Sequence, residues 1–243
     1  MHLTELLNIT KIQFIDIGTK DGIFKPLENY KQFLDIALFE PNKKFFDSLE
    51  IKYQDYSNIN VFNLAVSNFK GQANFYQTKM NSACSLLEPL SSELNKLNMK
   101  AFNVKEQKEV EVNFLDNLVY KENKINYKLP TILKIDAQGA DLKILEGGKK
   151  FISESVFGII CEISFISRYK GEPKPYQIFE FMENNGFILI KFTNHKYLEN
   201  LPNGLKEKLF FSDGIFIKEN LFGEINETNK NLINIINELF LIQ

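Results

Sequence analysis

The chain has 243 residues, 44% of them apolar and 25% charged, with a formal net charge of −2. This length suits an α/β domain with a substantial core, and the balanced charge gives no support for binding to a nucleic-acid backbone. No apolar run approaches the ~18 residues of a membrane-spanning helix, and the N-terminus has no signal-peptide pattern. Cys84 and Cys161 form no C-x-x-C pair or disulfide framework. We therefore expect a protein of the reducing cytoplasm, with Cys161 a buried thiol.

Short apolar runs alternate with helical patterns along the chain. The pattern predicts strands at 12–17, 36–40, 60–65, 72–77, 110–112, 131–135, 156–163, 187–192 and 210–217. It predicts helices at 22–33, 42–54, 115–120, 140–146 and 175–184. Residues 78–108 are irregular apart from a short helix near 91–98. We expect one α/β domain over 1–243, with a mostly parallel sheet covered by helices on both faces.

A last helix is predicted at about 227–242. Its apolar face carries Leu232, Ile235, Ile236, Leu239 and Phe240. We expect this face to dock on the core. A homodimer contact and a helix on a membrane surface are the alternatives, and the few basic residues on the polar face weigh against the membrane.

Acidic residues stand where four predicted strands end. The first strand leads into Asp16-Ile17-Gly18-Thr19-Lys20-Asp21-Gly22, the second ends at Glu40, and Asp136 and Glu162 follow later strands. Ligands of open α/β sheets bind at these carboxyl ends, and an acid at the end of the second strand can accept hydrogen bonds from a ribose diol. Glycines at 18 and 22 allow a close backbone approach. Because the loop is not G-x-G-x-x-G, a pyrophosphate-binding loop is not indicated.

Each feature also has a purely structural explanation. Gly18 could simply end a strand, Glu40 could favour a helix macrodipole, and Asp136 could cap the helix that follows it. An acid within an apolar strand, such as Asp16, is costly unless it is bonded. The four acids together predict one crevice that holds a ribose and a cationic group.

The sequence resembles the FkbM-type S-adenosylmethionine-dependent O-methyltransferases from about residue 14 to residue 192. The motifs that carry the resemblance are Phe14-Ile15-Asp16-Ile17-Gly18, Leu38-Phe39-Glu40-Pro41, Asn63-Leu64-Ala65-Val66-Ser67, Val112-Asn113-Phe114-Leu115-Asp116, Leu133-Lys134-Ile135-Asp136-Ala137-Gln138-Gly139 and Ile144-Leu145-Glu146-Gly147. The resemblance implies a class I methyltransferase (Rossmann-like) fold. Such a fold has a seven-stranded, mostly parallel sheet with helices on both faces and the last strand antiparallel.

The resemblance also implies contacts with S-adenosyl-L-methionine. The residues concerned are Asp16, Gly18, Glu40, Ala65, Ser82, Ser85 and Asp136. Asp16 and Gly18 would line the methionine end, Glu40 would hold the ribose hydroxyls, and Ala65 would lie by the adenine. Ser82 and Ser85 match a family segment near the methyl donor, and Asp136 closes the pocket.

Two motifs depart from the family pattern. Where the family reads D-x-G-A-N-x-G, this chain has Thr19-Lys20-Asp21 in the middle, and both glycines are kept. Where the family reads D-V-E-G, this chain has Ala137 and Gln138 in place of Val-Glu. The second change removes a carboxylate near the transfer site.

A base helps methyl transfer when the acceptor is a neutral hydroxyl. The candidates are Asp136, Glu162 and His195. His195 has the most suitable free pKa, although it could be an exposed loop residue. The same three side chains could ligate Mg²⁺ or Mn²⁺, but they form no compact ligand motif and we expect no metal.

Three basic residues are candidates for binding the acceptor. Arg168 and Lys170, in the loop 164–175, could bind a phosphate or carboxylate or lie in solvent. Lys134 shares a strand face with Asp136, where an ion pair could orient the acid or be structural. The loop and the insertion at 78–108 are expected to shape the acceptor side of the pocket.

The expected function is O-methylation of a small molecule. We expect the hydroxyl of a sugar or sugar-linked group, as in a bacterial surface glycan or capsular polysaccharide, and no nucleic-acid partner. The alternatives are an NAD-dependent oxidoreductase of Rossmann type, because Gly18 followed by Glu40 also fits that ribose contact, and a non-catalytic nucleotide-binding subunit.

Overall fold

The computed structural model describes residues 2–199, 201, 204–223 and 226–241. A seven-stranded sheet has the order β3-β2-β1-β7-β8-β10-β9. Its strands are β1 (Gln13–Ile17), β2 (Asp35–Phe39), β3 (Ile59–Phe62), β7 (Thr131–Ile135), β8 (Val156–Ser164), β9 (Phe187–Glu199) and β10 (Glu207–Lys218). β10 pairs antiparallel with β8 and β9, and the other pairs are parallel. The predicted class I architecture is confirmed.

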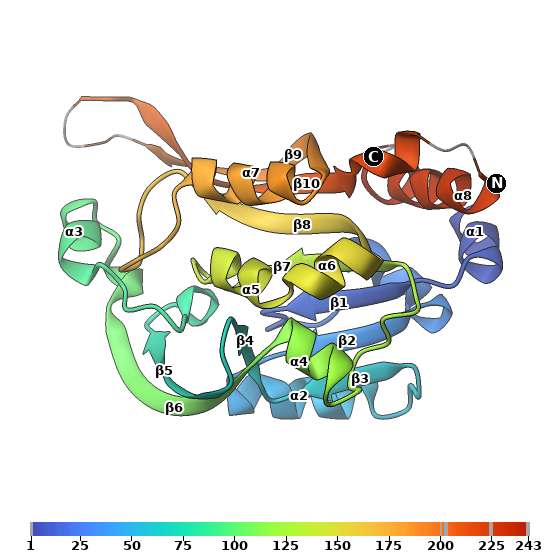
Figure 1. The fold of residues 1–243 in the computed structure, drawn as a ribbon. Helices are drawn as coiled ribbons and strands as arrows, with labels where there is room; N and C mark the ends of the chain where they lie inside the picture. The colour runs from blue at the N-terminus through green and yellow to red at the C-terminus, as the bar shows by residue number, and fades with distance from the viewer. Residues whose placement is uncertain (1, 200, 202–203, 224–225, 242–243) are drawn as a thin grey trace.

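Helices cover both faces of this sheet (Figure 1). They are α1 (Leu3–Ile9), the 3-10 helix η1 (Lys25–Phe33), α2 (Lys43–Tyr53), α4 (Leu115–Tyr120), α5 (Asp141–Gly147), α6 (Lys149–Ser155), α7 (Pro175–Asn184) and α8 (Glu227–Ile236). Strand side chains alternate between the two faces, so Phe14 packs in the core under α1, η1, α2 and α8 while Ile15 packs in the core under α4 to α7. Both cores stop at the carboxyl ends of β1, β2 and β7, where the polar residues begin.

A second, three-stranded sheet was not predicted. It has the order β4-β6-β5 and consists of β4 (Ala65–Ser67), β5 (Gly71–Thr78) and β6 (Val104–Phe114). The predicted strand at 60–65 is divided between β3 and β4, and the strand predicted at 110–112 begins six residues earlier, at Val104. Long antiparallel pairing with β5 stabilises the polar start of β6, which has no apolar alternation to reveal it.

The remaining insertion packs as a unit beside the main sheet. It contains the 3-10 turns η2 (Asn81–Ala83) and η3 (Lys100–Phe102) and the helix α3 (Ser91–Lys96). Leu94 and Phe102 form a small core with Tyr169 and Phe210 from the main domain. Figure 1 shows α3 at the end of the sheet opposite both chain termini.

Both ends of the chain pack where the parallel strands begin. α1 and α6 were not predicted, and the first predicted helix is the 3-10 helix η1. The predicted C-terminal helix is α8 followed by the π-helical turn η5 (Asn237–Leu241), and its last residue, 242, lies outside the described residues. Leu232, Ile235 and Ile236 are buried in the core, as expected for a docked helix.

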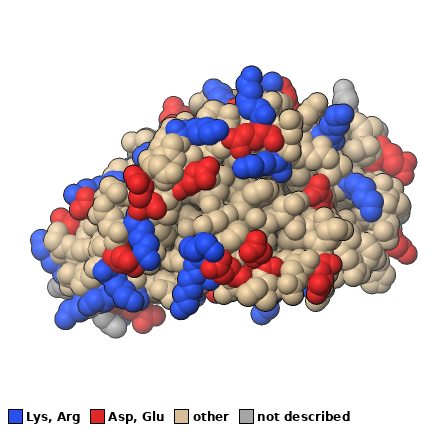
Figure 2. Space-filling view, turned by 90° about the horizontal axis from the view of Figure 1, so that it is seen from below, with Lys and Arg blue, Asp and Glu red and all other residues tan. Residues whose placement is uncertain are grey.

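Among the described residues, no helix has the length and apolarity needed to cross a membrane. Acidic and basic side chains are interspersed over the face shown in Figure 2, and neither sign dominates it. This face therefore lacks the one-sided basic footprint that backbone-driven nucleic-acid binding produces.

Candidate active site

A cavity of about 560 Å³ opens at the carboxyl ends of β1, β2 and β7. This volume lies within the range of small-molecule sites. The seven residues expected to contact the cofactor all line the cavity, namely Asp16, Gly18, Glu40, Ala65, Ser82, Ser85 and Asp136. They come from five separate regions of the chain, which the parallel strands, β4 and the insertion bring to one edge.

Gly18 joins the three central strands at the floor of the cavity. Its N–H donates to the Phe39 carbonyl at 3.0 Å, and the Asp136 N–H donates to the Ile17 carbonyl at 2.9 Å. Gly18 has φ +88°, and an added Cβ would lie 2.0 Å from the Asp136 carbonyl oxygen. Both the left-handed conformation and the close approach require glycine here.

Asp16 is held by a lysine from the neighbouring strand. Asp16 and Lys134 are register partners on β1 and β7, and Lys134 Nζ lies 3.0 Å from Asp16 Oδ1 and 4.0 Å from Asp136 Oδ2. Burial alone would lower the pKa of Lys134, but the Asp16 and Asp136 carboxylates outweigh it and raise that pKa. The closer partner of Lys134 is thus Asp16, where the sequence suggested Asp136.

Glu40 lies between β2 and α2 with one oxygen committed. Its Oε1 accepts from the Asn42 N–H at 2.7 Å, and Oε2 has no hydrogen-bond partner among the described residues. Burial raises the pKa of Glu40 to about 7, although the Asn42 hydrogen bond opposes the shift. A ligand that donates hydroxyl hydrogens here would stabilise the ionised form.

The wall next to Glu40 is apolar. It is formed by Phe39, Phe45, Leu64, Ala65, Val66 and Phe75. Phe39 is itself held by stacking on Phe62, with ring centroids 4.9 Å apart. A flat heteroaromatic ring would find dispersion contacts here.

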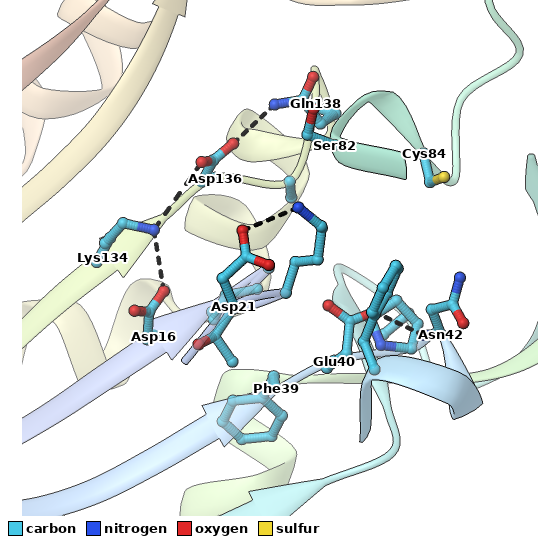
Figure 3. A pocket seen from close by; sticks show the side chains of 18 of the residues that line it. Asp16, Asp21, Phe39, Glu40, Asn42, Ser82, Cys84, Lys134, Asp136 and Gln138 are labelled. Carbon is cyan, nitrogen blue, oxygen red and sulfur yellow. Dashed lines mark hydrogen bonds and ion pairs between the residues drawn. The ribbon is translucent and has the colours of Figure 1, made fainter. Parts of the chain in front are cut away.

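Asp136 is the carboxylate at the other end of the cavity. Figure 3 shows it between Lys134 and Gln138. Its side chain is 41% exposed, whereas that of Asp16 is 1% exposed. Gln138 Nε2 donates to Asp136 Oδ1 at 2.8 Å, and the Ser85 hydroxyl donates to the Gln138 carbonyl at 2.8 Å. Asp136 therefore keeps an oxygen accessible from the cavity while its loop is tied to the insertion.

Four other predicted site residues lie outside the cavity lining. Glu162 and Arg168 are buried and paired with each other, and Arg168 also binds Glu172 at 2.9 Å. The sequence suggested that Arg168 contacts the acceptor or lies in solvent. Its burial outside the cavity lining agrees with neither interpretation. Burial raises the pKa of Glu162 to about 8, although Arg168 opposes the shift.

Lys170 and His195 are exposed. Lys170 pairs with Glu88 of the insertion at 2.7 Å. His195 does not follow a strand that ends at 192, as predicted, because β9 continues to Glu199. Its Nδ1 lies 3.0 Å from the Ser212 hydroxyl on β10. His195 thus lies outside the cavity lining, and no group of metal-ligating side chains is formed among the described residues.

A family model for the methyltransferase FkbM domain matches residues 16–189. The chain belongs to this family. Its domain is therefore that of an S-adenosylmethionine-dependent methyltransferase, and the NAD-dependent alternative is not retained. None of the curated proteins matches the sequence.

Solved structures with a related fold include three methyltransferases. The FkbM methyltransferase of Methylobacillus flagellatus KT is 12% identical with a TM-score of 0.46, over 85% of this chain and 43% of that one. Magnesium protoporphyrin IX methyltransferase of Synechocystis PCC 6803, with bound S-adenosylmethionine, is 11% identical with a TM-score of 0.43, over 89% and 76%. Precorrin-6y C5,15-methyltransferase of Geobacter metallireducens GS-15 is 9% identical with a TM-score of 0.39, over 89% and 85%. The chain thus spans less than half of the Methylobacillus protein.

Sequence reasoning missed two features of the site. It treated Gln138 only as a lost carboxylate, whereas the structure makes it a hydrogen-bond donor to Asp136. It also missed the ion pairs of Arg168 with Glu162 and Glu172. The spacing of Arg168 and Glu172, four residues apart, was the available signal, but nothing in the sequence indicated their burial.

Proposed function

We propose that the chain transfers a methyl group from S-adenosylmethionine to a hydroxyl of a small molecule, with Asp136 as the base. The observation that supports this most directly is the arrangement of the cavity. Glu40 with its free oxygen lies at one end, and the half-exposed Asp136 lies at the other.

The lining residues fit the cofactor. Glu40 Oε2 can accept from a ribose diol, the apolar wall can hold the adenine, and the glycine floor leaves room for the chain between them. Asp16 and Asp136 place negative charge at the methionine end, where the cofactor's amino group and sulfonium are positive. We assign Ala65 to the adenine, and Ser82 and Ser85 to the methyl-donor end.

The cofactor supplies a methyl group that its sulfonium already makes electrophilic. The residues of this chain then have two tasks, which are positioning the acceptor and removing its proton. Asp136 Oδ2 is the oxygen available for the proton, because Oδ1 is engaged by Gln138 and Asp16 is held by Lys134. Lys134 Nζ lies 4.0 Å from this oxygen.

We further propose a sugar or sugar-linked acceptor. The cavity lining includes Asn81, Ser82 and Gln138, and Figure 3 shows Ser82 and Gln138 near Asp136. These groups both donate and accept hydrogen bonds, which suits the hydroxyls of a sugar. Charged contacts from Arg168 or Lys170 have no part in this proposal, because both residues are paired with acids outside the cavity.

The test joins binding to product formation. Calorimetry should show binding of S-adenosylhomocysteine, and S-adenosylmethionine with a panel of hydroxylated sugars should yield a methylated sugar. Asp136→Asn should lower kcat by about 10²- to 10⁴-fold at saturating S-adenosylmethionine, because the base is lost. Asp47→Asn, on the exposed face of α2, is the matched control.

The outcomes separate the parts of the proposal. No binding of S-adenosylhomocysteine would contradict the cofactor assignment. Binding without transfer to any acceptor would favour a non-catalytic nucleotide-binding subunit, and transfer to other hydroxyl compounds alone would contradict the sugar. Full activity of the Asp136→Asn variant would remove Asp136 as the base.

A further inference from the structure

We propose that Gln138 is a positioning residue, which holds the Asp136 carboxylate in its orientation and charge state from a buried ion-pair cluster behind it. This inference rests on the proposed role of Asp136 as the base. It gives a function to the position at which this chain departs from the family's D-V-E-G pattern.

The contacts of Gln138 determine where its amide nitrogen and its amide oxygen lie. On one side Nε2 lies 2.8 Å from Asp136 Oδ1, and on the other side Oε1 lies 3.4 Å from Arg168 Nη1. A carboxylate can only accept and a guanidinium can only donate, so the amide must donate to Asp136 and accept from Arg168. Gln138 therefore connects the cavity to Arg168 in one orientation.

A glutamate at position 138 could not do this. It could accept from Arg168, but its second oxygen would face Asp136 Oδ1 at hydrogen-bond distance with no proton between them. Two carboxylates that share a site cannot both ionise easily. The glutamine avoids this repulsion and places a hydrogen-bond donor there instead, so Asp136 has no second carboxylate at contact distance on this side.

The far end of Gln138 is held firmly. Arg168 is 2% exposed and pairs with Glu162 and Glu172, which fix its guanidinium. The Tyr169 hydroxyl lies 3.2 Å from Gln138 Oε1 and 2.9 Å from the Ala83 carbonyl. The backbone is fixed as well, because Asp141 accepts from the Gly139 N–H at 3.0 Å and from the Ala137 N–H at 3.3 Å. Gln138 itself has φ +51°.

Titratable groups on the neighbouring elements interact electrostatically with Asp136. They are Asp16 on β1, Lys134 on β7, Asp141 on α5, Glu162 and the thiol of Cys161 on β8, and Asp213 on β10. Asp16, Asp141, Glu162 and Asp213 are carboxyl groups, so Asp136 stands among acids. Gln138 donates a hydrogen bond to Asp136 at 2.8 Å, and Lys134 is the cation that pairs with it at 4.0 Å.

The test titrates Asp136 directly. In protein labelled with ¹³C at the aspartate carboxyl carbons, Asp136 is assigned by its loss in Asp136→Asn and followed by NMR against pH. In Gln138→Glu, the titration midpoint should rise by about one pH unit or more, because a like charge is added at contact distance. Gln107→Glu makes the same change on an exposed position of β6 and should leave the midpoint unchanged.

Gln138→Met tests orientation separately from charge. The variant keeps the length of the side chain but lacks the donor, so it should lower kcat by about tenfold or more. Its S-adenosylhomocysteine affinity, and the acid limb of its profile of kcat against pH, should change far less than in Gln138→Glu. In Gln138→Glu, the acid limb should move to higher pH together with the NMR midpoint.

Each result decides something. An Asp136 midpoint that is the same in wild type and Gln138→Glu overturns the inference, whatever the protein catalyses. Equal losses of thermal stability, cofactor affinity and kcat in both variants, with no shift of the acid limb, would show a merely structural role. A shifted midpoint in a protein that transfers no methyl group would leave the Gln138 contact intact and contradict the proposed function instead.

Discussion

Glu40 shows how burial prepares a single residue for a ligand. One of its two carboxylate oxygens accepts from the Asn42 N–H, and the other has no hydrogen-bond partner among the described residues. The resulting pKa of about 7 means that Glu40 is only partly ionised near neutral pH before a ligand binds. Because a ribose diol donates to the ionised form, cofactor binding and ionisation of Glu40 should be coupled.

We expect the affinity for S-adenosylhomocysteine to rise about tenfold between pH 6 and pH 8. Below pH 7 most Glu40 carboxyls are protonated and must lose the proton when the ligand binds, whereas at pH 8 most are already ionised. Glu40→Gln keeps one acceptor and loses the charge, so it should weaken binding by about 10- to 100-fold. It should also abolish the pH dependence. Calorimetry of both proteins at pH 6, 7 and 8 measures this. A wild-type affinity that is the same at all three values, or a variant with the wild-type slope, would contradict the role of Glu40.

The loop between β8 and α7 is the element that connects the insertion to the site. Leu90 donates its N–H to the Arg168 carbonyl, and the Lys170 N–H donates to the Glu88 carbonyl, both at 2.8 Å. The Arg168 side chain turns inward to Glu162 and Glu172. The insertion, the loop and β8 are thus held together around one buried guanidinium, close behind the proposed base.

Replacing Arg168 with Met should destabilise the protein by about 3–5 kcal/mol, because two buried carboxylates lose their partner. Chemical denaturation measures the loss. Lys170→Met, two residues along the same loop, removes an exposed pair and should change little. If stranded charge is the cause, Glu162→Gln in the Arg168→Met background should recover part of the stability. A double variant less stable than Arg168→Met alone would point to lost packing instead.

At the scale of the whole molecule, the carboxyl edge of the sheet concentrates acids that are hard to ionise. Burial raises the pKa of Asp213 to about 6, of Glu40 and Asp141 to about 7 and of Glu162 to about 8. The opposite, amino edge is closed by the apolar contacts of α1 and α8. The acidic groups of the site and its surroundings are thus gathered at one end of the fold, and their burial lowers the free energy of unfolding.

The sign of this cost is testable. Each of these acids has a higher pKa in the folded than in the unfolded state, so between about pH 5 and pH 8 the unfolded state binds fewer protons. The free energy of unfolding of the ligand-free protein should therefore fall as pH rises through this window. Thermal midpoints at constant ionic strength from pH 5.5 to 8.5 would show it. Glu162→Gln should flatten the upper part of the curve, and a wild-type midpoint that rises toward pH 8 would be the opposite of this expectation.

The sequence by itself determined the arrangement of the main sheet and the cofactor half of the site. Apolar runs ended by Gly18, Glu40 and Asp136 are local signals, and parallel strands bring their carboxyl ends to one edge. The same locality explains what was missed. The polar first half of β6 depends on pairing with β5, and β9 continues past residue 192 because it pairs with β10.

Only the tertiary structure decided which charges meet. Lys134 lies closer to the carboxylate of Asp16, 118 positions away in sequence, than to that of Asp136, which is only two residues away. Arg168 is withdrawn from solvent by Glu162 and Glu172, and Gln138 becomes a donor to Asp136 because Arg168 stands behind it. The physical reason is that an ion pair or a hydrogen bond depends on distances of a few ångströms, and periodicity in a sequence predicts faces and ends of elements but not those distances.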